Sequence, residues 1–363
     1  MFQNAFKDKK ILITGHTGFK GSWLSAWLSQ LGSMVIGLSD RVPTEPAHYE
    51  LIKSDIVNDL RIDIKDAKAV YNTIREARPD FVFHLAAQPI VLESYKDPLH
   101  SFNTNAIGTA NVLDALRRTN NKCTAIMITS DKCYDNVEWT FGYRETDRLG
   151  GKDPYSGSKG AAELVIRSYV ESFFRKPDSN VRVAVGRAGN VIGGGDWAPH
   201  RILPDCIKAW STNEKSKIRN PNSTRPWQHV LEPLSGYLSL GRALSQNPDI
   251  NGEAFNFGPP ANQNHTVKEL VNEITKHWPG AEWIDHSNDN AHQEAGLLKL
   301  NCDKAFHTLG WETTMNFEET AQWTGEWYRS FYERGPKEAA MLTMKQINNY
   351  MELALARNSF KLD

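Results

Sequence analysis

Three closely spaced glycines near the N-terminus constrain the fold of this chain more than any other feature. The segment from Lys10 to Gly21 reads KILITGHTGFKG, so that a short apolar run is followed by Gly15, Gly18 and Gly21 at three-residue intervals. The apolar run is typical of a strand buried on both faces. Ser22–Leu31, directly after the glycines, has the amphipathic pattern of a helix. A strand, a glycine turn and a helix in this order predict a dinucleotide-binding unit.

Each glycine meets a separate requirement of a bound dinucleotide. Gly15 permits the tight turn after the strand, Gly18 lets the backbone approach a pyrophosphate, and Gly21 lets the helix pack closely on the strand. The pyrophosphate then lies at the helix N-terminus, where unpaired N–H groups and the positive end of the helix dipole meet it. Glycines alone are also ordinary turn residues, and here the adjoining strand and helix favour the nucleotide-binding interpretation.

An acidic residue after the second apolar run supports this interpretation. Met34–Leu38 is that run, and Asp40 follows it roughly 20 residues past the glycines, where a carboxylate accepts hydrogen bonds from the adenosine ribose. A carboxylate there repels the 2′-phosphate of NADP, although the adjacent Arg41 can offset the repulsion. We therefore expect NAD as the cofactor, with little use of NADP.

Strand-like and helix-like stretches alternate through the first half of the chain, which is the sequence form of a parallel sheet wound by helices. The expected strands are Met34–Ser39, Phe81–Leu85, Ala125–Ser130 and Val181–Val185, and the expected helices are Ala67–Ala77, Asn103–Arg118 and Ser158–Arg175. Gln88–Ser101 is expected to be a loop. The predicted fold class is α/β, a Rossmann-type doubly wound parallel sheet.

The pattern changes after Arg187. Three consecutive glycines and four prolines between residues 193 and 226 break the chain into short pieces. We expect an NAD-binding Rossmann domain in residues 1–187, with a return around residues 229–257, and a smaller, partly interleaved substrate-binding lobe mainly in residues 188–363. Glu253–Phe257 looks like a strand that rejoins the first sheet, and Lys337–Ala356 like a helix that caps the smaller lobe.

The composition excludes several classes of function. The 363-residue chain has a formal net charge of -1, which gives no broad attraction to nucleic acid or to an anionic membrane. No apolar run approaches the ~20 residues that span a bilayer, and the N-terminal MFQNAFKDKK lacks the apolar core of a signal peptide. The cysteines, which lack zinc or disulfide spacing, are Cys123, Cys133, Cys206 and Cys302. We expect a reduced cytoplasmic protein without a metal site.

A second group of residues has the spacing of an oxidoreductase site. Tyr155 and Lys159 are four residues apart, so on a helix both project from one face. An ammonium beside a phenol favours the phenolate and brings its pKa down from ~10 toward the range of a working base. Such a pair is common on helix surfaces, but Ser130 ends a predicted parallel strand, where ligands bind in open α/β sheets. The three residues together predict a catalytic hydroxyl, phenol and ammonium.

These residues resemble a known family. Thr14–Gly21, Ser130, and Tyr155 with Lys159 are similar to the extended branch of the short-chain dehydrogenase/reductase family, specifically its nucleotide-sugar enzymes, over nearly the whole chain. The resemblance implies bound NAD and hydride chemistry on a sugar held by its nucleoside diphosphate. It implies cofactor contacts from Gly15, Thr17, Gly18, Phe19, Lys20, Gly21, Asp40, Asp63, Ile64, Leu85, Ala86, Ala87, Asn105, Tyr155 and Lys159.

The resemblance extends into the second lobe, at Arg187–Gly193, Arg201–Pro204 and Arg225–Val230. Guanidinium groups match phosphates in geometry, although an exposed arginine can equally be a solvated surface group. The expected substrate contacts are Asn190, Arg201, Arg225, His292 and Lys299. In the family, helices that resemble Asn103–Arg118 and Ser158–Arg175 pair across a two-fold axis, so we expect a homodimer or a dimer of dimers.

Asp131 and Lys132, directly after Ser130, distinguish between reactions within the family. An acid and a second ionisable group at this position resemble the nucleotide-sugar 4,6-dehydratase group, in which thymidine-type members carry an Asp-Glu pair. The Ser-Asp-Lys triplet departs from that pair and resembles the members that act on CDP-glucose. Without such neighbours, Asp131 could equally cap a turn and Lys132 could be solvated. The expected catalytic residues are Ser130, Asp131, Lys132, Tyr155 and Lys159.

The resemblance implies a reaction in three stages on CDP-D-glucose. Tyr155, aided by Lys159 and Ser130, takes the proton of the 4-hydroxyl while hydride passes from carbon 4 to NAD. A base then removes the acidified proton at carbon 5, protonated Asp131 delivers a proton to the departing 6-hydroxyl, and hydride returns to carbon 6. A lysine ordinarily keeps its proton to about pH 10, so Lys132 acts either as a neutral base or as an ammonium that stabilises the enolate while water takes the proton. The product is a 4-keto-6-deoxy sugar nucleotide, of the kind used in deoxysugar and O-antigen biosynthesis.

Three other functions stay open at this point. A nucleotide-sugar 4-epimerase shares the fold, NAD and the catalytic hydroxyl, phenol and ammonium, but has no use for Asp131 as an acid. A GDP-mannose or dTDP-glucose dehydratase differs only in substrate, and residue types alone do not select cytosine. A non-catalytic NAD-binding scaffold needs the glycines but not the three catalytic groups together.

Overall fold

The structure is a computed structural model that describes residues 2–53, 56, 58–287 and 297–357. Its central sheet has seven parallel strands in the order β11–β6–β5–β4–β1–β2–β3. The strands are β1 (Lys10–Thr14), β2 (Met34–Ser39), β3 (Asn58–Arg61), β4 (Phe81–His84), β5 (Cys123–Ile128), β6 (Val181–Ala188) and β11 (Ala254–Phe257). In this register Leu12 lies opposite both Ile36 and Val82. The predicted α/β class with a doubly wound parallel sheet is confirmed.

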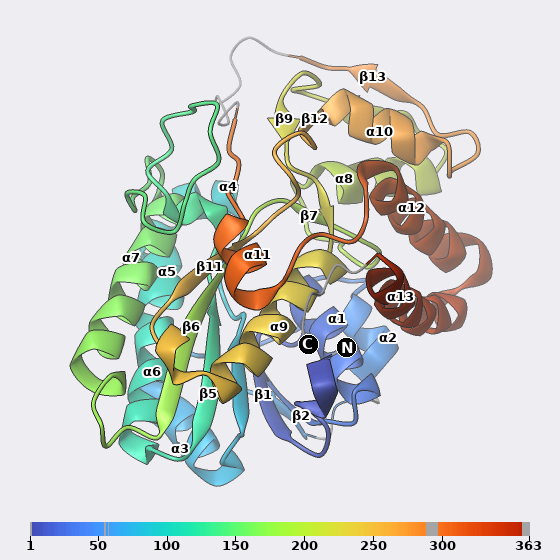
Figure 1. Cartoon of the computed structure of the whole chain (residues 1–363). Coiled ribbons are helices and arrows are strands. Elements are labelled where there is room, and N and C mark those ends of the chain that lie inside the picture. Colours follow the sequence, from blue (N-terminus) through green and yellow to red (C-terminus); the bar gives the residue numbers. More distant parts are fainter. Residues whose placement is uncertain (1, 54–55, 57, 288–296, 358–363) are drawn as a thin grey trace.

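Helices cover both faces of this sheet (Figure 1). The alternation of side chains along β1 shows why. Ile11 and Ile13 join a core with α1 (Phe19–Gln30) and α9 (Leu231–Gln246), whereas Leu12 joins a second core with α3 (Ala67–Ala77), α6 (Gly108–Thr119) and α7 (Pro154–Tyr169). The apolar run in the middle of β1, Ile11–Ile13, is thereby buried on both faces, as the sequence predicted.

The remaining elements form short strand pairs and helices, several of which gather apart from the sheet in the upper right of Figure 1. The strand pairs are β7 (Val191–Ile192) with β10 (Gln228–His229), β8 (Ser216–Ile218) with β13 (Trp283–Asp285), and β9 (Thr224–Arg225) with β12 (His265–Thr266). The helices are α2 (His48–Ile52), α8 (Ile202–Ser211), α10 (Val267–Thr275), α11 (Asp303–Leu309), α12 (Phe317–Arg334) and α13 (Pro336–Ala356).

The strand expected at Glu253–Phe257 is β11, which pairs in parallel with β6. The chain therefore returns to the sheet after it has left it, as an interleaved arrangement requires. The division of the chain at residue 187 stays a prediction.

The expected loop Gln88–Ser101 is wrong in detail. This segment contains two short helices, α4 (Val91–Lys96) and α5 (Pro98–Phe102). Asp97 separates them and caps the second, because its side chain accepts a hydrogen bond from the backbone N–H of His100 at 2.9 Å. Each helix is too short to show a 3.6-residue period in the sequence.

Two predicted helices begin at different residues from those expected. The one expected at Ser158–Arg175 begins at Pro154, because the Asp153 side chain caps it by accepting a hydrogen bond from the N–H of Ser156. The helix expected from residue 103 starts with a π-helical turn, Asn103–Ile107, and only then continues as α6. Boundaries of this kind depend on caps and bulges rather than on hydrophobic period.

The C-terminal helix α13 contacts helices from both ends of the chain. It packs on α12 and also on α1 and α2. The hydroxyl of Thr343 contacts the ring of His48 at 3.0 Å, and the ring of Tyr350 lies edge-on to Trp27. α13 therefore ties the two halves of the molecule together. No helix in the described part of the chain is long and apolar enough to cross a membrane.

Candidate active site

A cavity of about 1790 Å³ lies between the nucleotide-binding half and the residues that follow β6. Its wall is formed by the turns after β1, β2, β4 and β5, by the start of α7, and by side chains from residues 188 to 227. Parallel strands all end at one edge of the sheet, so these turns come together there. The cavity is the candidate active site.

The glycine turn forms one end of this cavity. Gly15 has a φ of 77°, and a Cβ there would lie 2.7 Å from the backbone nitrogen of Ala86. A Cβ on Gly21 would overlap the carbonyl oxygen of Gly15, and Gly18 is the N-cap of α1. The turn thus leaves no room for side chains and presents a helix N-terminus to the cavity, which fits a dinucleotide pyrophosphate. The other residues of the turn that line the cavity are Thr17, Phe19 and Lys20.

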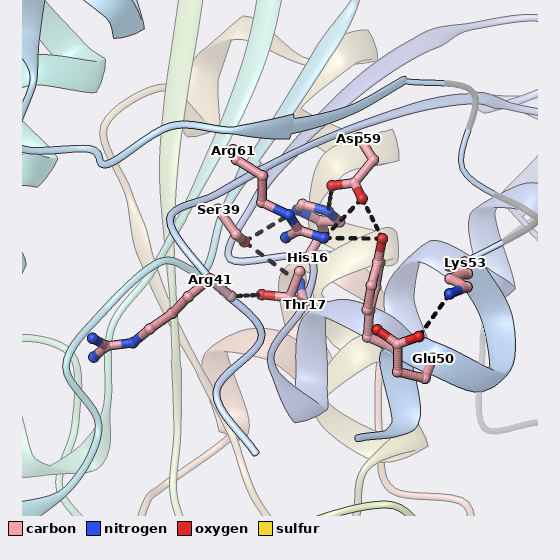
Figure 2. Close-up of polar contacts among 9 residues, drawn as sticks. His16, Thr17, Ser39, Arg41, Glu50, Lys53, Asp59 and Arg61 are labelled. Carbon is pink, nitrogen blue, oxygen red and sulfur yellow. Dashed lines mark hydrogen bonds and ion pairs between the residues drawn. The ribbon is translucent and has the colours of Figure 1, made fainter. Parts of the chain in front are cut away.

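A partly buried polar cluster fixes this turn to the neighbouring strands, and Figure 2 shows it. The ring of His16 contacts the Ser39 hydroxyl at 3.1 Å through Nδ1 and the Asp59 carboxylate at 2.8 Å through Nε2. Asp59 also accepts hydrogen bonds from the Tyr49 hydroxyl and from Arg61. Burial lowers the pKa of His16, although Asp59 opposes this. The sequence interpretation missed this cluster, because its members lie far apart in the chain.

Residues expected at the adenosine end line the cavity close to this cluster. Asp40 and Arg41 follow β2, and their side chains are 3.8 Å apart. The guanidinium of Arg41 points away from the cluster, while its carbonyl oxygen accepts a hydrogen bond from the Thr17 hydroxyl at 2.6 Å (Figure 2). Asp63 and Ile64 follow β3 and line the same end. Leu85, Ala86 and Ala87, expected beside the nicotinamide, follow β4 and also line the cavity.

Asn105 lies differently from the expectation. It is not among the residues that line the cavity, because it sits in the π-helical turn behind the wall. Its Nδ2 donates to the Ser158 hydroxyl at 2.8 Å and to the Gln88 carbonyl oxygen at 3.2 Å, and its Oδ1 accepts from the Gln88 N–H at 2.8 Å. Asn105 therefore braces the wall between β4 and α7 rather than forming part of its surface.

The triplet Ser130–Lys132 lines the other end of the cavity, directly after β5. The Ser130 hydroxyl donates to Asp131 Oδ1 at 2.9 Å and accepts from the Lys132 N–H at 3.2 Å. Asp131 is 3% exposed, and its Oδ2 has no hydrogen-bond partner among the described residues. Burial raises the pKa of Asp131, and the charge of Lys132 and the Ser130 hydroxyl oppose this. The site favours a neutral carboxyl that can donate a proton through Oδ2.

Tyr155 and Lys159 lie on one face of α7 at its start, and both line the cavity. Burial raises the pKa of Tyr155 to about 12, against the lowering effects of the Ser130 hydroxyl and the charge of Arg201. Burial lowers the pKa of Lys159 to about 8, while Cys133 and Glu163 raise it. A phenol with a hydroxyl partner and a nearby ammonium has the parts of a catalytic base.

Two further cations lie near these groups. Lys20 reaches from the glycine turn to within 3.5 Å of the Tyr237 hydroxyl, and Arg201 Nη1 lies 2.7 Å from Asp196 Oδ2. The pKa of Lys20 is lowered to about 7, chiefly by burial and also by the charge of Arg201, while Asp131 raises it. The sequence interpretation assigned Lys20 to the cofactor and Arg201 to the substrate, and did not place either beside the catalytic triplet.

Only some of the expected substrate contacts line the cavity. Asn190, Arg201 and Arg225 line the cavity, and Arg225 is 8% exposed. Lys299 does not line it, and its carbonyl oxygen accepts from the Tyr143 N–H at 2.9 Å. His292 lies outside the described residues. Polar residues that line the cavity and that the sequence interpretation missed are Asp196, His200, Lys217, Arg219 and His286.

Within the described ranges, no group of three or more His, Cys, Asp or Glu side chains is arranged to hold a metal ion. Cys123, Cys133, Cys206 and Cys302 are free thiols.

Comparison with known proteins gives consistent results. A family model described as GDP-mannose 4,6 dehydratase matches residues 12–324. The chain is 42% identical to CDP-glucose 4,6-dehydratase of Salmonella typhimurium (strain LT2) over 354 residues, which cover 96% of this chain and 98% of that protein. The fold is similar to that of UDP-glucuronic acid 4-epimerase from Bacillus cereus in complex with UDP-glucuronic acid and NAD, with a TM-score of 0.74, 21% identity, and coverage of 89% of this chain and 100% of that chain. It is also similar to DesIV, a dTDP-glucose 4,6-dehydratase from Streptomyces venezuelae with NAD and TYD bound, with a TM-score of 0.73, 20% identity, and coverage of 90% and 98%.

Proposed function

This chain belongs to the GDP-mannose 4,6-dehydratase family of NAD-dependent nucleotide-sugar enzymes, and we propose that it dehydrates CDP-D-glucose to CDP-4-keto-6-deoxy-D-glucose. The position of Asp131 is the observation that most supports a dehydratase over a 4-epimerase. Its buried carboxyl lines the cavity next to Ser130, and Oδ2 is left without a partner among the described residues. A 4-epimerase has no step that needs this acid.

The first stage falls to the groups on α7 and at the end of β5. The glycine turn and Asp40 would hold NAD, which would supply a reversible hydride acceptor for the sugar. Tyr155 takes the proton of the 4-hydroxyl; burial raises its pKa to about 12, and the Ser130 hydroxyl and the charge of Arg201 oppose this rise. Lys159 supplies a positive charge on the same helix face, which favours the phenolate.

The second stage, elimination of water, falls to Asp131 and Lys132. Asp131 delivers its proton from Oδ2 to the departing 6-hydroxyl. Lys132, the next residue, takes part at carbon 5, either as a neutral base or as an ammonium that stabilises the enolate while water takes the proton. The 4-ketone formed in the first stage acidifies the carbon 5 proton, so either role is chemically sufficient. A proton returns to carbon 5, from the same base or from water, when hydride is delivered to carbon 6.

The nucleotide end of the substrate meets a set of cations. Arg225 is the leading phosphate contact, because a guanidinium binds phosphate in a bidentate manner. Asn190 and Arg201 line the same cavity, between Arg225 and the catalytic groups in the chain order. The choice of CDP as the nucleotide is supported by the 42% identity to a CDP-glucose 4,6-dehydratase over nearly the full length of both chains.

The proposal is tested by incubating the protein separately with CDP-, UDP-, dTDP- and GDP-linked glucose, and with GDP-mannose. Alkali develops the absorbance of a 4-keto sugar, and mass spectrometry detects the loss of water. We expect both signals with the CDP sugar. An epimerised product of unchanged mass would indicate a 4-epimerase, and a signal with another nucleotide only would replace the proposed substrate. Absence of turnover with NAD binding intact would favour a scaffold.

Assembly as a dimer is proposed from the surface formed by α5, the π-helical turn and α7. It exposes four large apolar side chains, Leu99, Phe102, Ile107 and Leu164, which are 74%, 38%, 52% and 57% exposed. Exposed apolar side chains grouped in this way mark interaction surfaces. Sedimentation as a monomer at micromolar concentration would contradict the dimer. We further propose a cytoplasmic enzyme whose keto-deoxy product feeds deoxysugar biosynthesis of the O-antigen type.

A further inference from the structure

A buried ion pair behind the cavity wall joins two elements that meet at the reaction end. Glu163 lies on α7 and Arg187 lies near the end of β6, and each side chain is only 4% exposed. The guanidinium binds the carboxylate in a bidentate manner, with Nε–Oε1 and Nη2–Oε2 distances of 2.8 Å. Neither residue lines the cavity. Any effect of the pair on the reaction must therefore pass through other residues.

The pair holds both flanks of the catalytic triplet. The Thr129 hydroxyl, one residue before Ser130, donates to Glu163 Oε1. Arg187 Nη1 donates to the hydroxyl oxygen of Tyr134, two residues after Lys132, at 2.8 Å. The residues on both sides of the triplet are therefore hydrogen-bonded to the same ion pair.

The same pair lies in line with the phenol and the ammonium. Tyr155, Lys159 and Glu163 follow one another at four-residue intervals on α7, so they share one face of that helix. The Glu163 carboxylate raises the pKa of Lys159 and so opposes the effect of burial. The ion pair therefore acts on the Ser130–Lys132 segment through hydrogen bonds to its neighbours, and on Lys159 through charge.

The network beyond the pair is closed by Asn256 on β11. The Tyr134 hydroxyl donates to Asn256 Oδ1 at 2.8 Å, and Asn256 Nδ2 donates to the carbonyl oxygens of Tyr143 and Asn301 at 2.8 and 3.1 Å. A buried ion pair adds little net stability, because the cost of removing two charges from water offsets their attraction. What such a network does provide is a single geometry, since every member depends on its neighbours.

We infer that the Glu163–Arg187 pair is a positioning device, which sets the Ser130–Lys132 segment in place relative to Tyr155 and Lys159. The inference rests on the proposed function. Both stages of the reaction require groups from β5 and α7 to meet one sugar, and small displacements of reacting groups cost large factors in rate.

The test uses two variants that each remove one hydroxyl, Thr129→Val and Tyr134→Phe. Because each loses a hydrogen bond to a charged group, we expect kcat with CDP-glucose to fall about tenfold while KM stays within about twofold of the wild-type value. Thr129 and Tyr134 themselves line the cavity, so an unchanged KM separates positioning from direct contact with the substrate. Tyr350→Phe is the control for loss of a buried hydroxyl, because its hydroxyl binds a buried glutamate, Glu232, at 2.8 Å and Tyr350 does not line the cavity. The control should keep the wild-type kcat.

A third variant, Glu163→Gln, tests the electrostatic part. Loss of the carboxylate lowers the pKa of Lys159, because Glu163 raises it in the wild type. In the pH profile of NADH formation in a single turnover, the decline on the alkaline side should therefore begin at a lower pH in Glu163→Gln than in the wild type. Thr129→Val keeps the carboxylate, so its alkaline limb should stay where the wild-type limb lies.

The inference is overturned if Thr129→Val and Tyr134→Phe keep the wild-type kcat, or if Tyr350→Phe loses as much as they do. If Glu163→Gln folds and the alkaline limb of its pH profile stays where the wild-type limb lies, the electrostatic part of the inference is wrong. If this variant does not fold, Thr129→Val and Tyr134→Phe alone test the positioning role. Failure of the proposed function is a separate result. If the wild-type protein reduces its NAD with a different nucleotide sugar, the same variants are ranked with that sugar.

Discussion

Replacing Glu232 with Gln should remove a pH-dependent contribution from the stability of this protein. Glu232 lies in the first turn of α9 and is 1% exposed. Its carboxylate accepts hydrogen bonds from the N–H groups of Thr314 and Met315, the latter at 2.7 Å, and from the Tyr350 hydroxyl at 2.8 Å. It therefore joins α9 to α13 and to the segment before α12. Burial raises the pKa of this carboxyl from 4.5 to about 7, although the hydrogen bonds lower it.

The magnitude follows from this difference between the unfolded and folded pKa. A carboxyl whose folded pKa is raised is favoured in its neutral form, so its contribution to stability is complete below the unfolded value and is lost as pH rises through the folded value. A shift from 4.5 to about 7 corresponds to about 3 kcal/mol of unfolding free energy at 1.36 kcal/mol per unit. The amide of Gln carries no charge, so the variant does not lose this energy.

Urea unfolding followed by tryptophan fluorescence across this pH range measures the effect. The unfolding free energy of Glu232→Gln minus that of the wild type should rise by about 3 kcal/mol from below pH 4.5 to above pH 7. Glu319→Gln should change with pH in the opposite direction, because the hydrogen bond from Arg357 lowers the pKa of Glu319 and its contribution is lost as pH falls. Glu319 also raises the pKa of Glu232, so this comparison is read below pH 4.5, where Glu232 is protonated in both the folded and unfolded states. Equal pH slopes in the wild type and Glu232→Gln would refute the reasoning.

Four further outcomes are expected. Asp131→Asn should still form NADH from CDP-glucose, but product should appear about 10²–10⁴-fold more slowly, because the general acid is lost. In the wild type, elimination should slow as pH rises and the Asp131 carboxyl, whose pKa is raised, ionises. The Asn variant should lack this pH dependence. Lys132→Ala should also form NADH while solvent deuterium entry at carbon 5 and product collapse, and near-normal turnover would contradict its participation. Gly21→Ala should weaken NAD binding by about tenfold or more in a fluorescence titration, because its Cβ overlaps the Gly15 carbonyl oxygen. NADP should bind at least about tenfold more weakly than NAD because of Asp40, and equal affinities would count against that role.

Local sequence patterns predicted the parts of this fold that local physics determines. An apolar run bounded by polar residues identified β1, and the glycine spacing identified the turn after it, which the structure places at the cavity. The resemblance to nucleotide-sugar 4,6-dehydratases, carried by the same residues, is confirmed by the family model and by the relative at 42% identity. In these cases the informative residues lie close together in the chain.

Features that depend on contacts across the chain were not predicted. His16 and Asp59 are 43 residues apart, and nothing in either local pattern indicates that the two side chains meet. The family resemblance implied a cofactor contact from Asn105, but a π-helical turn directs its side chain toward Gln88 and Ser158. Such outcomes follow from tertiary packing, which hydrophobic period does not encode.

Local sequence also does not predict the surroundings of a buried acid, and those surroundings determine which acid is suited to donate a proton. Asp131 and Glu163 are both buried carboxyls near the end of β5, and as residue types they are equivalent. Glu163 faces a bidentate guanidinium and the Thr129 hydroxyl, an environment that suits an anion. Asp131 has the Ser130 hydroxyl on Oδ1 and no partner among the described residues on Oδ2, and burial raises its pKa. A buried carboxyl whose pKa is raised is suited to donate a proton, whereas a carboxylate held in an ion pair is suited to act as a fixed charge. Exchange of their surroundings, not of their identities, would reverse these roles.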